Sequence, residues 1–138
     1  MGSTVKQVAE RVGLPSRTIR YYDRIGLVCA DERSEAGYRL YSAEEEDRLR
    51  FIRRAKRLGF SLEDIRGLLA AAEGGCGSTV PELDRLLEQK LAELDANIAG
   101  LTAFRARLVD YRAGKRLIGS DCCRGGAFCG CLDDVPEP

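Results

Sequence analysis

Apolar residues recur every three or four positions along most of the 138-residue chain, a spacing that predicts a mainly α-helical protein. The expected short helices lie at 5–12, 16–25, 42–58 and 61–72. Gly13, Gly26 and Gly59 follow the first three helices, where glycine commonly ends a helix. Ser42 and Ser61 open the third and fourth helices in capping boxes. The first two helices, separated by a Gly-Leu-Pro turn, form a candidate helix-turn-helix.

The longest helical pattern runs from Thr79 to about Arg112 and predicts one amphipathic helix with a coiled-coil seam. Thr79 with Glu82 forms a capping box, Pro81 falls in the first turn, and Gly114 can end the helix. At the α-helical rise of about 1.5 Å per residue, roughly 33 residues span about 50 Å. The seam contains one arginine among apolar residues and consists of Leu87, Leu91, Leu94, Ile98, Leu101, Arg105 and Leu108. We expect the helix to pair with a second copy of itself.

An alternating segment at 37–41 predicts a strand that pairs with 28–33 as a β-hairpin wing. The second helix of the helix-turn-helix would be the recognition helix, because its polar side carries donors for phosphates and base edges. The residues expected to contact DNA from this helix are Ser16, Arg17, Thr18, Arg20 and Tyr21. From the wing, Arg33, Tyr38 and Arg39 are expected to reach the DNA backbone. An ordinary helix pair with a polar surface is the alternative.

Charge is distributed unevenly although the net charge is zero. Residues 1–60 carry 13 Lys and Arg against 9 Asp and Glu, and the remainder carries 9 against 13. A basic front half suggests a polyanionic partner. A basic surface on the third helix is either a second phosphate contact, with Lys56 as its main candidate, or simply solvated, and it consists of Arg50, Arg53, Arg54, Lys56 and Arg57.

These patterns predict three parts. A winged helix-turn-helix DNA-binding domain occupies 1–73, a hinge and dimerisation helix 74–118, and a Cys-rich effector-binding loop and tail 119–138. The glycine-rich stretch 73–78 is expected to be a flexible joint. No apolar run approaches the roughly 20 residues of a membrane span, and no signal peptide opens the chain. We therefore expect a cytoplasmic protein with no membrane partner.

The chain has six cysteines and no histidine, so histidine catalysis and histidine ligands are excluded and any metal would be held mainly by sulfur. In the cytosol such thiols serve metal or redox chemistry more often than a disulfide framework. Cys29 has apolar neighbours and is predicted to be buried and inert. Cys76 precedes the long helix, and four cysteines follow it: Cys122, Cys123, Cys129 and Cys131. The length of the helix keeps the two groups apart within one chain, whereas an antiparallel homodimer would bring them together.

Three stretches resemble the MerR family of bacterial transcription regulators. They are Thr18–Tyr22 continuing to Gly26–Leu27, then Gly37–Tyr41, then Arg57–Ile65. The resemblance implies a winged-helix domain and an antiparallel coiled-coil dimer on a near-palindromic promoter. It also implies that the effector changes the twist and bend of the DNA so that RNA polymerase can engage, and that specificity rests partly on this deformation.

The cysteines resemble those of the divalent-metal sensors of that family, for mercury, zinc, cadmium or lead. Those sensors carry a cysteine shortly before the dimer helix, matched by Cys76, and a cysteine-bearing loop after it. Copper-type sensors have serine at the first position. Thiolates suit Zn(II), Cd(II), Hg(II) and Pb(II), and the spacing permits a site from Cys122, Cys131 and Cys76 of the other chain. Cys123 and Cys129 are then left for a fourth ligand or a second ion, and a metal bridging both chains would shift the angle between the DNA-binding domains.

Three other interpretations stay open. A permanent zinc clip would make the cysteines structural. An iron–sulfur redox sensor occurs among relatives, but it spaces its cysteines as C-x2-C-x-C-x5-C, whereas this chain has C-C-x5-C-x-C. The third is a thiol oxidoreductase or a metal-carrying chaperone. The chain has no Cys-x-x-Cys motif, which counts against this interpretation. An enzyme is not expected.

Overall fold

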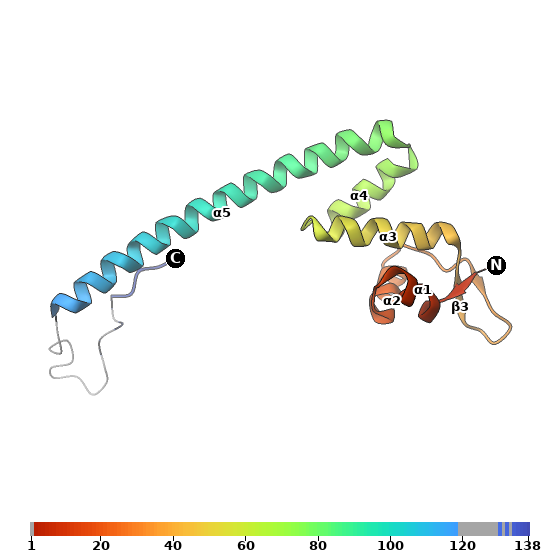
Figure 1. Ribbon diagram of the computed structural model, residues 1–138, viewed down its shortest axis with the longest axis horizontal. Coiled ribbons are helices and arrows are strands. Elements are labelled where there is room, and N and C mark those ends of the chain that lie inside the picture. The colour runs from red at the N-terminus through yellow and green to blue at the C-terminus, as the bar shows by residue number, and fades with distance from the viewer. Residues whose placement is uncertain (1, 119–129, 131, 133) are drawn as a thin grey trace. The chain divides into compact units, whose positions relative to one another are not determined.

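The structure is a computed structural model that describes residues 2–118, 130, 132 and 134–138. It contains two compact units, Met1–Lys90 and Leu91–Pro138. Helix α5 (Cys76–Ile118) begins in the first unit and continues into the second (Figure 1). The expectation of a mainly helical chain with a long helix near its C-terminus is confirmed. Within the described residues, no helix combines the length and apolar character needed to span a membrane.

The predicted helix-turn-helix is formed by α1 (Val5–Val12) and α2 (Ser16–Arg24). Thr4 caps α1 in a capping box with Gln7. Gly13 ends α1 in the left-handed conformation at φ 77°, and its amide donates to the carbonyl of Ala9. A residue with a Cβ is strained at this φ, so glycine permits the sharp entry into α2.

A three-stranded antiparallel sheet forms the wing, with β1 (Ser3–Thr4), β2 (Glu32–Arg33) and β3 (Arg39–Tyr41) in the order β1-β3-β2. Pairing of β2 with β3 confirms the predicted hairpin. Gly37 lies in the connecting turn at φ 85°, and its carbonyl accepts a hydrogen bond of 3.0 Å from Arg33 Nη1. Strand β1 is additional to the prediction and places the N-terminus of α1 beside the wing.

The second helix pair is α3 (Ala43–Arg57) and α4 (Leu62–Glu73). Ser61 caps α4 in the predicted capping box with Asp64, whereas Ser42 caps α3 through the amide of Glu45 alone, because the Glu45 carboxylate accepts from the Cys29 amide. Apolar residues from α1, α2, the wing, α3, α4 and the start of α5 form one core, whose most buried members are Val8, Val12, Ile19, Tyr41, Leu49, Ile52, Phe60 and Ile65. Because side chains from all these elements pack together, the position of the recognition helix α2 is fixed by α1, the wing and the pair α3 and α4.

The start of the long helix differs from the prediction. Helix α5 begins at Cys76, so the expected joint at 73–78 reduces to Gly74 and Gly75, the latter at φ 87°. Pro81 lies inside the helix, and the hydroxyl of Thr79 donates to the carbonyl of Gly75 at 2.9 Å. The predicted capping box of Thr79 is therefore wrong. Leu86 of α5 is only 2% exposed and anchors the helix in the core of the first unit, whereas the added residues 76–78 are exposed.

The apolar seam of α5 divides between two roles. Leu87 packs partly against the core of the first unit, beside Leu83 and Leu86. In the second unit the remaining apolar seam residues are between 44% and 68% exposed, and they are Leu91, Leu94, Ile98, Leu101 and Leu108. Five large apolar side chains at heptad spacing on one helix form a stripe of the kind that pairs with another helix.

Candidate nucleic-acid interface

The recognition helix and the wing enclose a cavity of about 350 Å³. Arg20 of α2 and Tyr38 of the wing lie on its wall, and Tyr38 is 67% exposed. The other lining residues are Thr4, Val5, Gly37, Arg39 and Tyr41. The helix presents Arg20 outward because its neighbour Ile19 is fully buried. The cavity therefore joins a cation and an aromatic hydroxyl from two separate elements, and contact of Arg20 and Tyr38 with a DNA backbone stays a prediction.

Asp23 of α2 fixes the wing against the recognition helix. Its Oδ2 accepts hydrogen bonds from Arg39 Nη1 at 3.0 Å and from the Tyr41 hydroxyl at 2.9 Å. Burial of Tyr41 and its hydrogen bond to Asp23 raise the pKa of the phenol to about 12, so the hydroxyl keeps its proton. Two bonds from one strand to one helix make the wing and the recognition helix a single rigid surface. The sequence offered no signal for Asp23, whose partners lie 16 and 18 residues away.

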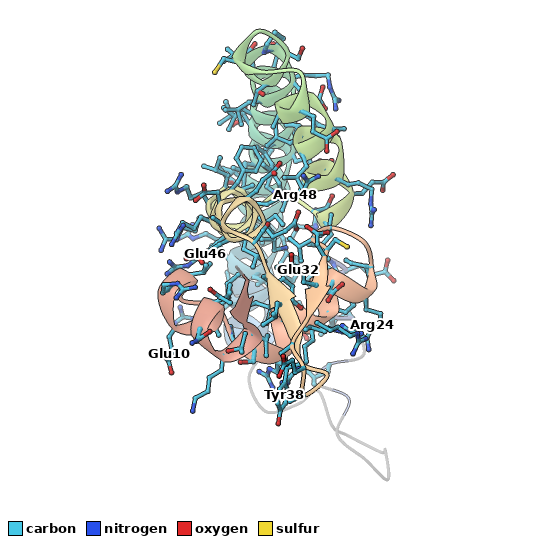
Figure 2. The ribbon with its side chains drawn as sticks, turned by 90° about the vertical axis from the view of Figure 1, so that its right-hand side faces the viewer. Glu10, Arg24, Glu32, Tyr38, Glu46 and Arg48 are labelled. Carbon is cyan, nitrogen blue, oxygen red and sulfur yellow. The ribbon has the colours of Figure 1, made fainter. Side chains whose placement is uncertain are left out.

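Two of the three wing residues predicted to contact DNA form hydrogen bonds within the domain. Arg39 forms an ion pair with Asp23, and Arg33 supports the hairpin turn through the carbonyl of Gly37. Tyr38 carries its side chain outward at the wing tip (Figure 2). The guanidinium groups of Arg33 and Arg39 keep further donors, since each has five N–H groups. Their contact with DNA stays a prediction.

A second hollow of about 430 Å³ lies at the other side of the recognition helix. It brings together Arg17, Thr18 and Tyr21 of α2 with Lys56 of α3. Lys56 Nζ also donates to the carbonyl of Phe60 at 3.4 Å. Ser16 begins α2 directly after Pro15. Three of the predicted contacts from α2 thus lie near Lys56 of α3, while Arg20 lines the first cavity.

The remaining basic residues of α3 lie elsewhere. A hollow of about 110 Å³ between α1 and α3 is lined by Arg11, Val12, Arg50, Arg53, Arg54 and Arg57. Arg53 Nη1 donates to the carbonyl of Val12 at 2.9 Å. Arg11 and Arg50 both bind Glu46, at 2.9 Å and 2.6 Å. The predicted basic surface is therefore two surfaces, one with Lys56 beside α2 and one formed by arginines of α1 and α3, of which Arg11 and Arg50 bind Glu46.

Glu46 links α1 to α3 and is expected to stabilise the domain. Its hydrogen bonds with Arg11 and its proximity to Arg50 hold the pKa of the carboxyl below its ordinary value of 4.5. Glu46→Gln should lower the free energy of unfolding by about 1 to 2 kcal/mol at neutral pH. Because the folded pKa is depressed, this stabilisation is complete above the unfolded pKa and disappears as the pH falls through the folded pKa. Urea unfolding from pH 7 to about pH 3 measures both effects.

The matched control for Glu46→Gln is Asp47→Asn, which removes an exposed carboxylate that binds Arg50 at 2.9 Å. This control should change stability little, because exposed ion pairs contribute about 0 to 1 kcal/mol. A Glu46→Gln protein as stable as the wild type at pH 7 would show that the Arg11 contact contributes nothing.

The cysteines are only partly described. Cys76 is exposed at the first residue of α5. The four C-terminal candidates Cys122, Cys123, Cys129 and Cys131 lie outside the described residues, and their role stays a prediction. Among the residues that the structure describes, no group of three or more Cys, Asp or Glu side chains forms a metal site.

The prediction that Cys29 is buried is wrong. Cys29 is exposed, and its backbone amide donates to Glu45 Oε2 at 2.8 Å. The chain leaves the core after Val28, which is 3% exposed, so the apolar neighbours do not bury the thiol. A hydrogen bond with Asp31 raises the pKa of the Cys29 thiol, which disfavours the thiolate that would bind a metal.

A helix-turn-helix, a wing locked to its recognition helix, and a supporting second helix pair define a winged helix-turn-helix DNA-binding protein. The chain belongs to the MerR family: the model of MerR HTH family regulatory proteins matches residues 3–72, and the MerR DNA-binding model matches residues 46–111. Members of this family are transcriptional regulators and not enzymes.

Similarity to individual relatives extends along the chain. The transcriptional regulator HmrR of Rhizobium leguminosarum bv. viciae is 43% identical over 104 residues, covering 75% of this chain and 79% of HmrR. The regulator ZntR of Escherichia coli K12 is 34% identical over 137 residues, 96% of this chain and 92% of ZntR. The structure of PbrR691 from Ralstonia metallidurans CH34 in complex with lead(II) superposes with a TM-score of 0.72 at 28% identity, covering 97% and 99% of the two chains.

Proposed function

We propose that the protein is a homodimeric, metal-responsive transcriptional activator. It binds promoter DNA through α2 and the wing, and a thiophilic divalent ion such as Hg, Zn, Cd or Pb binds Cys76 with cysteines of the C-terminal loop. Metal binding then distorts the promoter so that RNA polymerase can engage it. The observation that carries the proposal is the position of Cys76: it is exposed and opens the same helix whose Leu86 is buried in the DNA-binding unit.

The metal part of the proposal is supported by the lead(II) complex of PbrR691, which matches this chain over nearly its whole length. Sulfur ligands suit such ions, and the chain has no histidine that could replace them. The DNA part is supported by the family and by two hollows on either side of the recognition helix that carry arginine, lysine and tyrosine. Dimerisation is supported by the exposed apolar stripe of α5.

Cys76→Ser should abolish the metal response and leave promoter binding intact. Serine is a poor ligand for a thiophilic ion, while the exposed position of residue 76 means that its replacement disturbs no core contact. The test is transcription from the promoter by purified RNA polymerase with and without Zn(II), Cd(II) or Hg(II), beside a promoter-shift assay. Cys122→Ser and Cys131→Ser are expected to behave alike, and Cys29→Ser is the matched control with a wild-type response.

Two results would contradict this assignment. Loss of promoter binding together with the metal response would make the cysteines structural. A brown protein containing iron and sulfide after anaerobic purification would favour the iron–sulfur redox regulator, whereas a colourless protein that gains ultraviolet thiolate bands on metal titration supports the proposal.

A further inference from the structure

The C-terminal end of the recognition helix is held by arginines from two other helices. Arg48 of α3 donates from Nε to the carbonyl of Leu27 at 3.1 Å. Arg66 of α4 donates from Nη2 to the carbonyl of Ile25 at 2.8 Å. Both carbonyls closely follow α2, where the backbone has unsatisfied acceptors. The direction of the recognition helix therefore depends on where α3 and α4 place these two guanidinium groups.

Arg48 also binds the end of α4. Its Nη2 lies 2.9 Å from Oε1 of Glu73, the last residue of that helix. Arg48 leaves α3 on the side opposite Glu46 (Figure 2). A guanidinium is planar and rigid, so one arginine can hold a carbonyl and a carboxylate in a fixed relation, which the flexible point charge of lysine cannot do. Arg48 thus joins the end of the recognition helix to the end of α4.

Glu73 is close in sequence to the candidate metal ligand. Only Gly74 and Gly75 separate it from Cys76, and Gly75 adopts φ 87°. Ten residues beyond Cys76, Leu86 is buried in the core and anchors α5. Because α5 is anchored at Leu86, a displacement of Cys76 would act on the other neighbouring segment, which is Gly74, Gly75 and then Glu73. The two glycines can adopt the changed backbone direction.

We propose that Arg48 is a positioning residue that couples metal binding at Cys76 to the recognition helix. A displacement of Cys76 on metal binding would move Glu73, and the ion pair of Glu73 with Arg48 would pass this movement to the carbonyl of Leu27. The inference rests on the proposed function, because it requires a metal at Cys76. The Glu73 side chain is 65% exposed, so its ion pair with Arg48 contributes little to stability. Its removal should therefore affect the transfer of the signal and leave the fold intact.

The test is Glu73→Gln, which keeps the shape of the side chain and removes its charge. Three quantities are measured for wild type and variant: the affinity for Zn(II) and Cd(II), the affinity of the metal-free protein for a promoter duplex, and the metal-induced increase in transcription. The two affinities should stay within about threefold, and the induction ratio should fall by about fivefold or more, the range of an ordinary coupling between sites.

Two further variants sharpen the result. Asp47→Asn is the matched control, since it removes another exposed carboxylate that binds an arginine of α3 and should keep the wild-type induction ratio. Arg48→Lys should reduce the induction ratio as Glu73→Gln does, and the double variant should be no worse than Arg48→Lys alone, as expected for one shared interaction. Thermal unfolding of each variant checks that the domain remains folded.

Either of two outcomes overturns the inference while the proposed function stands: a Glu73→Gln protein with the wild-type induction ratio, or an Asp47→Asn protein whose induction falls as much. A wild-type protein that binds metal and promoter but shows no induction contradicts the proposed function itself and removes the basis of the coupling as well.

Discussion

Arg20→Ala should strongly weaken promoter binding while the domain stays folded. Arg20 lines the cavity between the recognition helix and the wing, and in the described part of the chain it has no hydrogen bond or ion pair that the substitution would break. An arginine contact to a base or a phosphate contributes about 1 to 3 kcal/mol, and the proposed dimer would lose two of them. The expected decrease in affinity is thus about 30-fold or more.

The measurement is fluorescence anisotropy of a labelled promoter duplex at several salt concentrations. If Arg20 binds phosphate, the slope of log affinity against log salt should fall by about one for each arginine removed, whereas an arginine bound to a base edge would give discrimination at one position of the duplex. The metal should make no difference to the decrease. Arg85→Ala is the matched control, because Arg85 has the same charge but lies on α5 and binds Glu82 at 2.7 Å. Equal affinities for wild type and Arg20→Ala would place the DNA on another surface.

The local elements could be predicted from sequence because their signals are local. Capping serines, helix-ending glycines and the period of apolar residues lie within a few positions of the features that they determine. The helix-turn-helix, the hairpin and the pair α3 and α4 are accordingly confirmed. The order of these elements, together with the motifs at Thr18–Tyr22, Gly37–Tyr41 and Arg57–Ile65, was sufficient for the family.

The features that sequence missed depend on contacts between distant residues. Strand β1 exists because Ser3 pairs with Tyr41, and a two-residue strand has no pattern of its own. Helix α5 starts at Cys76 and continues through Pro81, and the local signals at Thr79 and Pro81 did not show that Leu83, Leu86 and Leu87 would anchor it on the core. The residues next to Asp23 and Arg48 in the sequence give no sign of a special role. Their roles follow only from hydrogen-bond partners 16 to 25 residues away. The prediction for Cys29 was wrong because its neighbours in sequence are apolar while its own position is exposed.

Ile98→Asp should convert the protein to a monomer, with weaker promoter binding as a consequence. Ile98 is 62% exposed in the middle of the apolar stripe of α5, and pairing with a second helix would bury it. Each large apolar side chain buried in such a seam contributes about 1.5 to 3 kcal/mol, and the variant would lose this at both copies. Burying two unpaired carboxylates adds a further penalty, so the dissociation constant of the dimer should rise by at least about 100-fold.

Sedimentation or light scattering at micromolar protein gives the mass directly, and the anisotropy assay gives the effect on DNA. A dimer engages two half-sites at once, and a monomer lacks the effective concentration that links the second half-site to the first. Ala96→Asp is the matched control: it introduces the same charge on α5, two residues from Ile98 and hence on the other side of the helix. A dimer that survives Ile98→Asp but dissociates with Ala96→Asp would assign the seam to the opposite face and refute the pairing proposed for Leu91, Leu94, Ile98, Leu101 and Leu108.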